Sequence, residues 1–149
     1  MTRWISIEAA QTGHQADLVS LCGVLGYPLQ AAQLATRLTH INRHPDHRLY
    51  LALTPEKAVG WIHLVHTLRL TSDPYVEIAG LVVDNGHRAR GIGRQLIERA
   101  RLWAIEHGAC QLRVRCQSHR CEAHRFYRAT GFDEIKQQQV FSLPLTPGT

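Results

Sequence analysis

The stretch LVVDNGHRARGIGRQL, residues 81–96, decides the fold of this 149-residue chain. An apolar run ends at Val83, a polar turn follows, and Gly91 and Gly93 precede a segment with helical spacing. This order predicts a buried strand, a glycine loop and a helix. Glycines allow a ligand close to the backbone, and the free amides of a first helical turn attract an anion. Two glycines alone fit a plain strand-to-helix turn equally well.

The arginines of the same loop favour an anionic ligand. Arg88, Arg90 and Arg94 surround the two glycines and add positive charge where phosphates would bind. No lysine follows Gly93, which argues against an ATP-binding loop of the Walker type. Arg88 stands where a dinucleotide-binding motif needs its first glycine, so NAD is not expected either.

Apolar spacing predicts that strands and helices alternate along the rest of the chain. The clearest helix is 92–107, because its apolar residues recur on one face and Gly108 stands at its C-terminal end. The expected strands are 2–10, 49–53, 59–70, 75–83, 110–116 and 132–143, and the expected helices are 13–25, 28–41, 92–107 and 119–130. We therefore expect a single α/β domain over 1–149.

Composition narrows the classes of partner. The net charge of +5 and the pI near 9.4 favour an anionic partner. No apolar run approaches the roughly 18 residues of a membrane span, and residues 1–8 lack a secretory signal, so we expect a cytoplasmic location and no membrane partner. The arginines are not interleaved with exposed aromatics, which argues against nucleic acid. The 4 cysteines and 10 histidines lack metal-ligand spacing, so no metal is expected.

Two motifs resemble the signatures of the GNAT superfamily of N-acetyltransferases. The string 81–83 followed by Arg-x-x-Gly-x-Gly and Leu96 resembles its acetyl-CoA-binding signature. The string 123–127, Ala-His-Arg-Phe-Tyr, followed by Gly131-Phe132, resembles its second signature. The resemblance implies a twisted mixed sheet of about six to seven strands with about four helices. It also implies acetyl-CoA as the acyl donor.

The same resemblance implies roles for individual residues. Tyr127 matches the tyrosine that protonates the departing thiolate, although a helix aromatic packed beside Phe126 would look the same. Glu77 matches the glutamate that takes the proton of the amine, with an ordinary salt bridge as the alternative. The donor-binding residues implied by the first signature are Leu81, Val82, Val83, Arg88, Ala89, Arg90, Gly91, Ile92, Gly93 and Arg94. A backbone amide around Val82 or Val83 would polarise the thioester, so these residues can also be plain core strand.

The acceptor is less defined than the donor. The string 120–127 is similar to a subgroup that includes aminoalkylphosphonate and small-amine N-acetyltransferases, although Arg120 replaces the asparagine that the superfamily often has there. We therefore expect a small-molecule amine. The alternatives are a protein N-terminus or lysine as acceptor, and a non-catalytic acyl-CoA-binding module. The resemblance also allows a homodimer.

Overall fold

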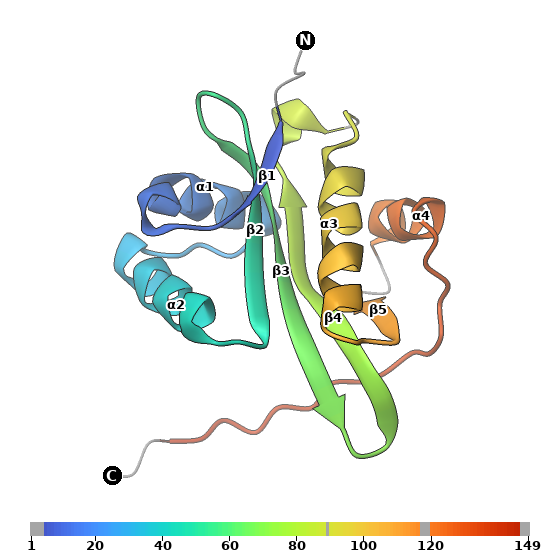
Figure 1. The fold of residues 1–149 in the computed structure, drawn as a ribbon. Coiled ribbons are helices and arrows are strands. Elements are labelled where there is room, and N and C mark those ends of the chain that lie inside the picture. Colours follow the sequence, from blue (N-terminus) through green and yellow to red (C-terminus); the bar gives the residue numbers. More distant parts are fainter. Residues whose placement is uncertain (1–4, 89, 117–119, 147–149) are drawn as a thin grey trace.

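The structure is a computed structural model that describes residues 5–88, 90–116 and 120–146. Its strands form a sheet in the order β1-β2-β3-β4-β5, in which only the β4–β5 pair is parallel (Figure 1). The elements are β1 (Ser6–Ala9), η1 (Thr12–His14), α1 (Gln15–Leu25), α2 (Ala31–Arg43), β2 (His47–Leu53), β3 (Ala58–Arg69), β4 (Ser72–Val83), η2 (Asn85–His87), α3 (Ile92–Glu106), β5 (Gln111–Val114) and α4 (Cys121–Ala129). The α/β class and the four α-helices are as expected from the sequence.

Helices cover both faces of the sheet (Figure 1). On one face, α1 and α2 pack their buried leucines against β2 and β3. On the other face, α3 buries the apolar stripe that its sequence predicts. The buried residues of α3 are Ile92, Leu96, Ile97, Ala100, Trp103 and Ala104. None of the described helices is both long and apolar enough to cross a bilayer.

The first two helices begin later than expected. α1 starts at Gln15 after the short η1 turn, and it ends at Gly26, whose φ of 97° gives a left-handed C-cap. α2 begins at Ala31, because Gln30 and Gln33 form a reciprocal capping box in which the Gln30 amide donates to Gln33 Oε1 at 3.1 Å. The expected helical turn at Pro28 is therefore wrong.

A bulge in β4 divides that strand into two halves. His63 of β3 pairs with Gly80 and Leu64 pairs with Ile78, so Ala79 has no opposite residue. Below the bulge, Val76 and Ile78 belong to the core under α3, whereas beyond it Val82 belongs to the core under α1. The strand also begins at Ser72, three residues before the expected start at 75, because the hairpin turn lies at 70–71.

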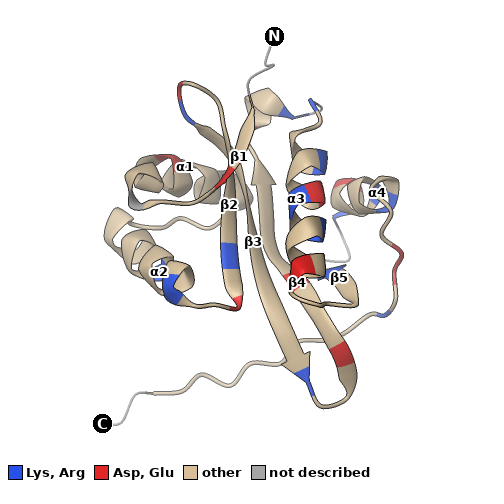
Figure 2. Cartoon of the chain, in the orientation of Figure 1, with Lys and Arg blue, Asp and Glu red and all other residues tan. Residues whose placement is uncertain are grey.

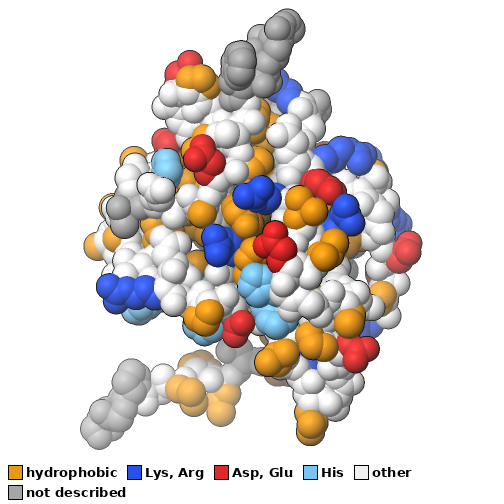
Figure 3. Space-filling model, in the orientation of Figure 1, with side chains coloured by type: hydrophobic (Ala, Val, Ile, Leu, Met, Phe, Trp, Pro, Cys, Tyr) orange, Lys and Arg blue, Asp and Glu red, His pale blue; other side chains and the backbone are white. Residues whose placement is uncertain are grey.

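The strand expected over 132–143 is not formed. Residues 133–146 have no regular structure, and in the view of Figure 1 the segment runs from α4 across the lower part of the β3–β4 hairpin towards the C-terminus. Its apolar side chains stand clear of the body (Figure 3), with Phe141 88% exposed and Val140 83% exposed. Alternating apolar residues favour a strand only where a neighbouring edge supplies backbone partners. The described sheet therefore has five strands rather than six or seven.

Candidate active site

The N-terminus of α3 has no side-chain cap. Its N-cap residue, Gly91, has a φ of 79° and no side-chain cap, so the first amides of the helix have no side-chain acceptor. A Cβ built on Gly91 would meet no atom within 4 Å beyond its chain neighbours, so the space at that position is open. Backbone amides and the helix dipole at such a point bind phosphate groups. Ala89 lies outside the described residues.

Gly93 also has a packing role. A Cβ at this position would lie 2.8 Å from Cζ of Phe126, so the missing side chain makes room for the Phe126 ring of α4. This glycine therefore allows α4 to pack closely on α3, and its expected place in the donor site stays a prediction that concerns its backbone. Its neighbour Ile92 is 1% exposed, so only its backbone can face a ligand.

The arginines of the loop point in different directions. Arg88 donates through Nε to the carbonyl of Val83 at 3.4 Å. Arg94 donates to the carbonyl of Ala129 at 3.3 Å and so reaches the C-terminal end of α4. Both side chains, and Arg90, are exposed. In Figure 2, the blue of Lys and Arg marks the loop before α3, α3 itself and α4. Positive charges therefore lie on several sides of the N-terminus of α3.

A gap opens between β4 and β5 beside this loop. The two strands pair only from Tyr75 to Ile78, so the edge of β4 from 79 to 83 has no strand beside it among the described residues. The amide of Asp84 donates to Val59 of β3. Because amides alternate in direction along a strand, the amide of Val83 faces the gap. An extended polar ligand can pair with this edge as a strand would.

Tyr127 lies on the α3 side of the sheet. Its ring contacts the rings of Phe126 and Phe132 with centroid separations of 5.3 and 5.6 Å. Burial, with a smaller contribution from the nearby Cys116, raises the pKa of Tyr127 to about 12, and Arg120 partly opposes the shift. The phenol therefore keeps its proton at neutral pH.

Glu77 lies on the opposite face of the sheet from Tyr127. It pairs in register with Val65 of β3 and Arg113 of β5, and its carboxylate accepts a hydrogen bond from Arg115 Nε at 3.1 Å. One quarter of its side chain is exposed. Sequence-predicted residues thus come together in two groups, with the loop and Tyr127 on one face and Glu77 on the other. The gap beyond Ile78 lies between them.

A histidine pair on the same sheet face as Glu77 was missed by sequence reasoning. His47 Nδ1 and His63 Nε2 are 2.9 Å apart, and burial, with a smaller contribution from His47, lowers the pKa of His63 to about 4. The ring of His66 instead lies beside that of His107, with a centroid separation of 5.7 Å, so His63 and His66 face opposite sides of the sheet. The pair escaped notice because the expected strand began at 49, two residues after His47. The described residues hold no group of three or more ligand side chains that could bind a metal ion.

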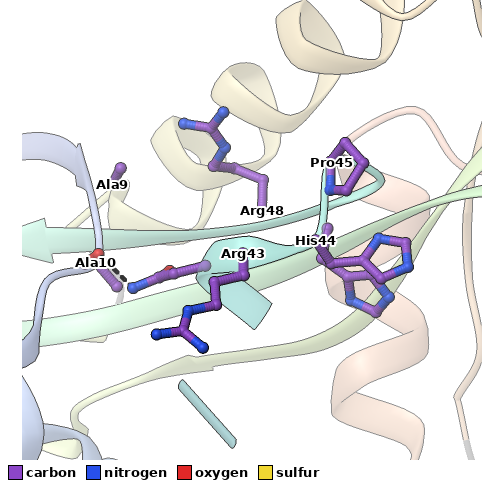
Figure 4. A pocket seen from close by; sticks show the side chains of 8 residues that line it. Ala9, Ala10, Arg43, His44, Pro45 and Arg48 are labelled. Carbon is purple, nitrogen blue, oxygen red and sulfur yellow. Dashed lines mark hydrogen bonds between the residues drawn. The ribbon is translucent and has the colours of Figure 1, made fainter. Parts of the chain in front are cut away.

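A pocket of about 300 Å³ lies at the other edge of the sheet. It is formed by the ends of β1 and α2 and the start of β2. In Figure 4, Arg48 extends towards α3 and Arg43 extends away from it. β3 separates β2 from β4 in the sheet, so this pocket is not continuous with the β4–β5 gap.

Known proteins resemble this chain in sequence and in fold. The model of the acetyltransferase (GNAT) family matches residues 17–132. No curated protein matches the chain. A transcriptional regulator from Bacillus halodurans C-125 is 22% identical, with a TM-score of 0.85 over 94% of this chain and 100% of its own. The aminoglycoside 6′-N-acetyltransferase AAC(6′)-Ih from Acinetobacter baumannii is 16% identical, with a TM-score of 0.85 over 96% and 100%. AAC(6′)-Iy, in complex with the bisubstrate analogue CoA-S-monomethyl-acetylneamine, is 18% identical, with a TM-score of 0.84 over 95% and 99%. These likenesses show the fold.

Proposed function

The chain belongs to the GNAT acetyltransferase family and is an acetyl-CoA-dependent acetyltransferase, and on this basis we propose that it acetylates the primary amine of a small molecule by direct attack in a ternary complex. One observation carries the proposal: the unpaired edge of β4 leads to the uncapped N-terminus of α3. The extended pantetheine arm of acetyl-CoA, which ends in a pyrophosphate, matches both features. The aminoglycoside acetyltransferases among the similar structures support a small amine as acceptor.

The donor site uses backbone groups. The amides that follow Gly91 would hold the pyrophosphate, with Arg88 and Arg90 supplying charge nearby. The amide of Val83 faces the gap, so it would donate to the thioester oxygen and polarise the carbonyl. Acetyl-CoA supplies the activated acyl group, and this chain would orient it.

Proton transfer uses groups on the two sides of the gap. The amine must lose a proton as its nitrogen bonds to the acyl carbon, and Glu77 is the carboxylate on that side. The sulfur must gain a proton as the carbon–sulfur bond breaks, and Tyr127 is the protonated group on the other side. Arg115 competes with the incoming amine for Glu77, so the carboxylate would act through water or after that ion pair opens.

Calorimetric titration with acetyl-CoA tests the donor site, with NAD as comparator. We expect micromolar binding of acetyl-CoA and none of NAD. Thiol release from acetyl-CoA in the presence of free amines and of an amine-bearing peptide then tests the acceptor. Acetylation of the peptide alone would replace the small-molecule proposal with a protein acetyltransferase. Absence of acetyl-CoA binding would contradict the proposal as a whole.

A further inference from the structure

The sheet face that carries Glu77 is only half covered by helices. α1 and α2 pack over the half that contains Leu49, Leu51 and Val82. The other half carries polar side chains, because Glu77 pairs with Arg113 and Tyr75 pairs with Gln111 in the parallel β4–β5 ladder. This second half, which we call the arginine face, is defined by Arg69, Tyr75, Glu77, Arg113 and Arg115.

Tyr75 forms the floor of the arginine face. Its side chain is only 1% exposed, and two guanidinium groups cover it. The guanidinium carbon of Arg113 lies 4.1 Å from the ring centroid. Arg69 lies 6.0 Å from the same centroid and donates through Nε to the Tyr75 hydroxyl at 2.7 Å. Stacking and hydrogen bonding therefore hold both guanidinium groups in place.

Positive charge exceeds negative charge on this face. Arg115 is paired with Glu77 at 3.1 Å, and in the described part of the chain neither Arg69 nor Arg113 forms a salt bridge of its own, although the charge of Glu77 also acts on Arg69. Arg113 donates to the amide oxygen of Gln111 at 2.9 Å and lines a pocket of about 360 Å³ with Asp73, Ser72, Cys110 and Gln111. The side chain of Asp73 is exposed. The pocket lies beside Arg113, and its lining does not include Glu77 or Arg69.

We propose that the acceptor amine belongs to a small molecule that also carries an anionic group, a carboxylate or a phosphonate, which Arg113 and Arg69 bind while the amine meets Glu77. This inference rests on the proposed acetyl transfer and names its substrate class. Arg113 pairs in register with Glu77, and its guanidinium stacks on Tyr75, two residues before Glu77 on β4. One small molecule can therefore contact the carboxylate and a guanidinium group together.

The same charges select against polycationic amines. An aminoglycoside would bring several ammonium groups beside two guanidinium groups, and like charges at short range repel. The positive face also favours the uncharged form of the bound amine, which is the form that attacks the acyl carbon. Specificity and nucleophile activation would therefore have one electrostatic origin.

Matched acceptors test the inference by thiol release from acetyl-CoA. 2-Aminoethylphosphonate and β-alanine each have a neutral analogue of similar length, 2-aminoethanol and 3-amino-1-propanol, and neamine serves as the polycation. We expect kcat/KM to be at least about tenfold higher for an anionic amine than for its neutral analogue, as the loss of one charged hydrogen bond would give. The phosphonate and carboxylate arms show which anion the face prefers.

Variants assign the effect to the arginine face. Arg113→Gln and, separately, Arg69→Gln should raise KM for the anionic amines about tenfold and leave the neutral amines unchanged. Arg113→Lys should recover part of the loss, because lysine keeps the charge but not the planar fork. Arg101→Gln is the matched control, since Arg101 is an exposed arginine that pairs with Glu98 on α3. Thermal melting identifies any variant that has lost its fold.

The outcomes separate this inference from the proposed function. Equal turnover of anionic and neutral amines, or a preference for neamine, would overturn the anionic acceptor while acetyl transfer itself stands. If acetyl-CoA binds but no anionic amine is acetylated or binds to the CoA complex by calorimetry, the inference also fails. If acetyl-CoA does not bind, the proposed function fails first.

Discussion

β4 presents two different recognition surfaces. In the proposed function, its edge beyond Ile78 would offer backbone amides to the donor, whereas its face would offer the side chain of Glu77 to the acceptor. Backbone recognition depends on chain geometry and on glycine, so it leaves a motif in the sequence. Side-chain recognition depends on which residues the neighbouring strands bring alongside. This difference explains why the donor is readable from the sequence and the acceptor is not.

The largest expected effect is at the glycine that opens α3. Gly91→Val should weaken acetyl-CoA binding by about a hundredfold or more, because the left-handed φ of 79° disfavours valine and the new side chain enters the open space before the helix amides. Calorimetric titration measures the loss. Gly93→Val is the matched comparison: its side chain would meet Phe126, so it should lower the melting temperature first. Unchanged affinity in Gly91→Val would remove the loop from the donor site.

Tyr127→Phe should lower kcat by about tenfold to a hundredfold, because the sulfur loses its proton donor. The dissociation constant of acetyl-CoA should stay within about twofold, because the ring contacts with Phe126 and Phe132 remain. Single-turnover kinetics and calorimetry measure the two quantities. A kcat equal to that of the unmodified enzyme would reduce Tyr127 to a packing residue.

Glu77→Gln should lower kcat/KM by about tenfold near neutral pH and less at high pH, where the free amine is already deprotonated. The amide keeps the shape of the side chain, so acetyl-CoA binding should not change. The pH profile of thiol release measures the effect. A loss that is constant across pH would indicate that Glu77 positions the acceptor and does not accept its proton.

The smallest expected effect is on the free energy of unfolding, through His63, which lies on the same sheet face as Glu77. The pKa of His63 is lowered from 6.5 to about 4 in the folded chain, so between these values the unfolded chain binds a proton that the folded chain does not. Folding stability should therefore fall as the pH falls from about 6.5 to 4, by about 2 to 3 kcal/mol in total. His63→Gln should flatten this dependence, as measured by denaturant unfolding at pH 7 and 5. His40→Gln, at an exposed position of α2, is the control, and an unchanged slope in His63→Gln would refute the assignment.

Local patterns predicted most of the fold. The apolar stripe on α3, the neighbouring strands β2 and β3, and Gly108 at the C-terminal end of α3 are all present, because each depends on neighbours in sequence. The strand expected over 132–143 failed for the opposite reason. Its alternation is real, but a strand exists only beside another edge, and pairing across the chain is not written in local spacing.

The candidate site divides in the same way. The sequence by itself determined the glycine loop, the loop arginines and the Tyr127 helix, because a backbone cradle for a phosphate requires residue types at fixed spacing. Only the tertiary structure decided that Gly93 serves Phe126, that His47 meets His63 and that three arginines surround Tyr75 and Glu77. Those contacts join residues far apart in the chain, and strand register, not sequence spacing, brings them together.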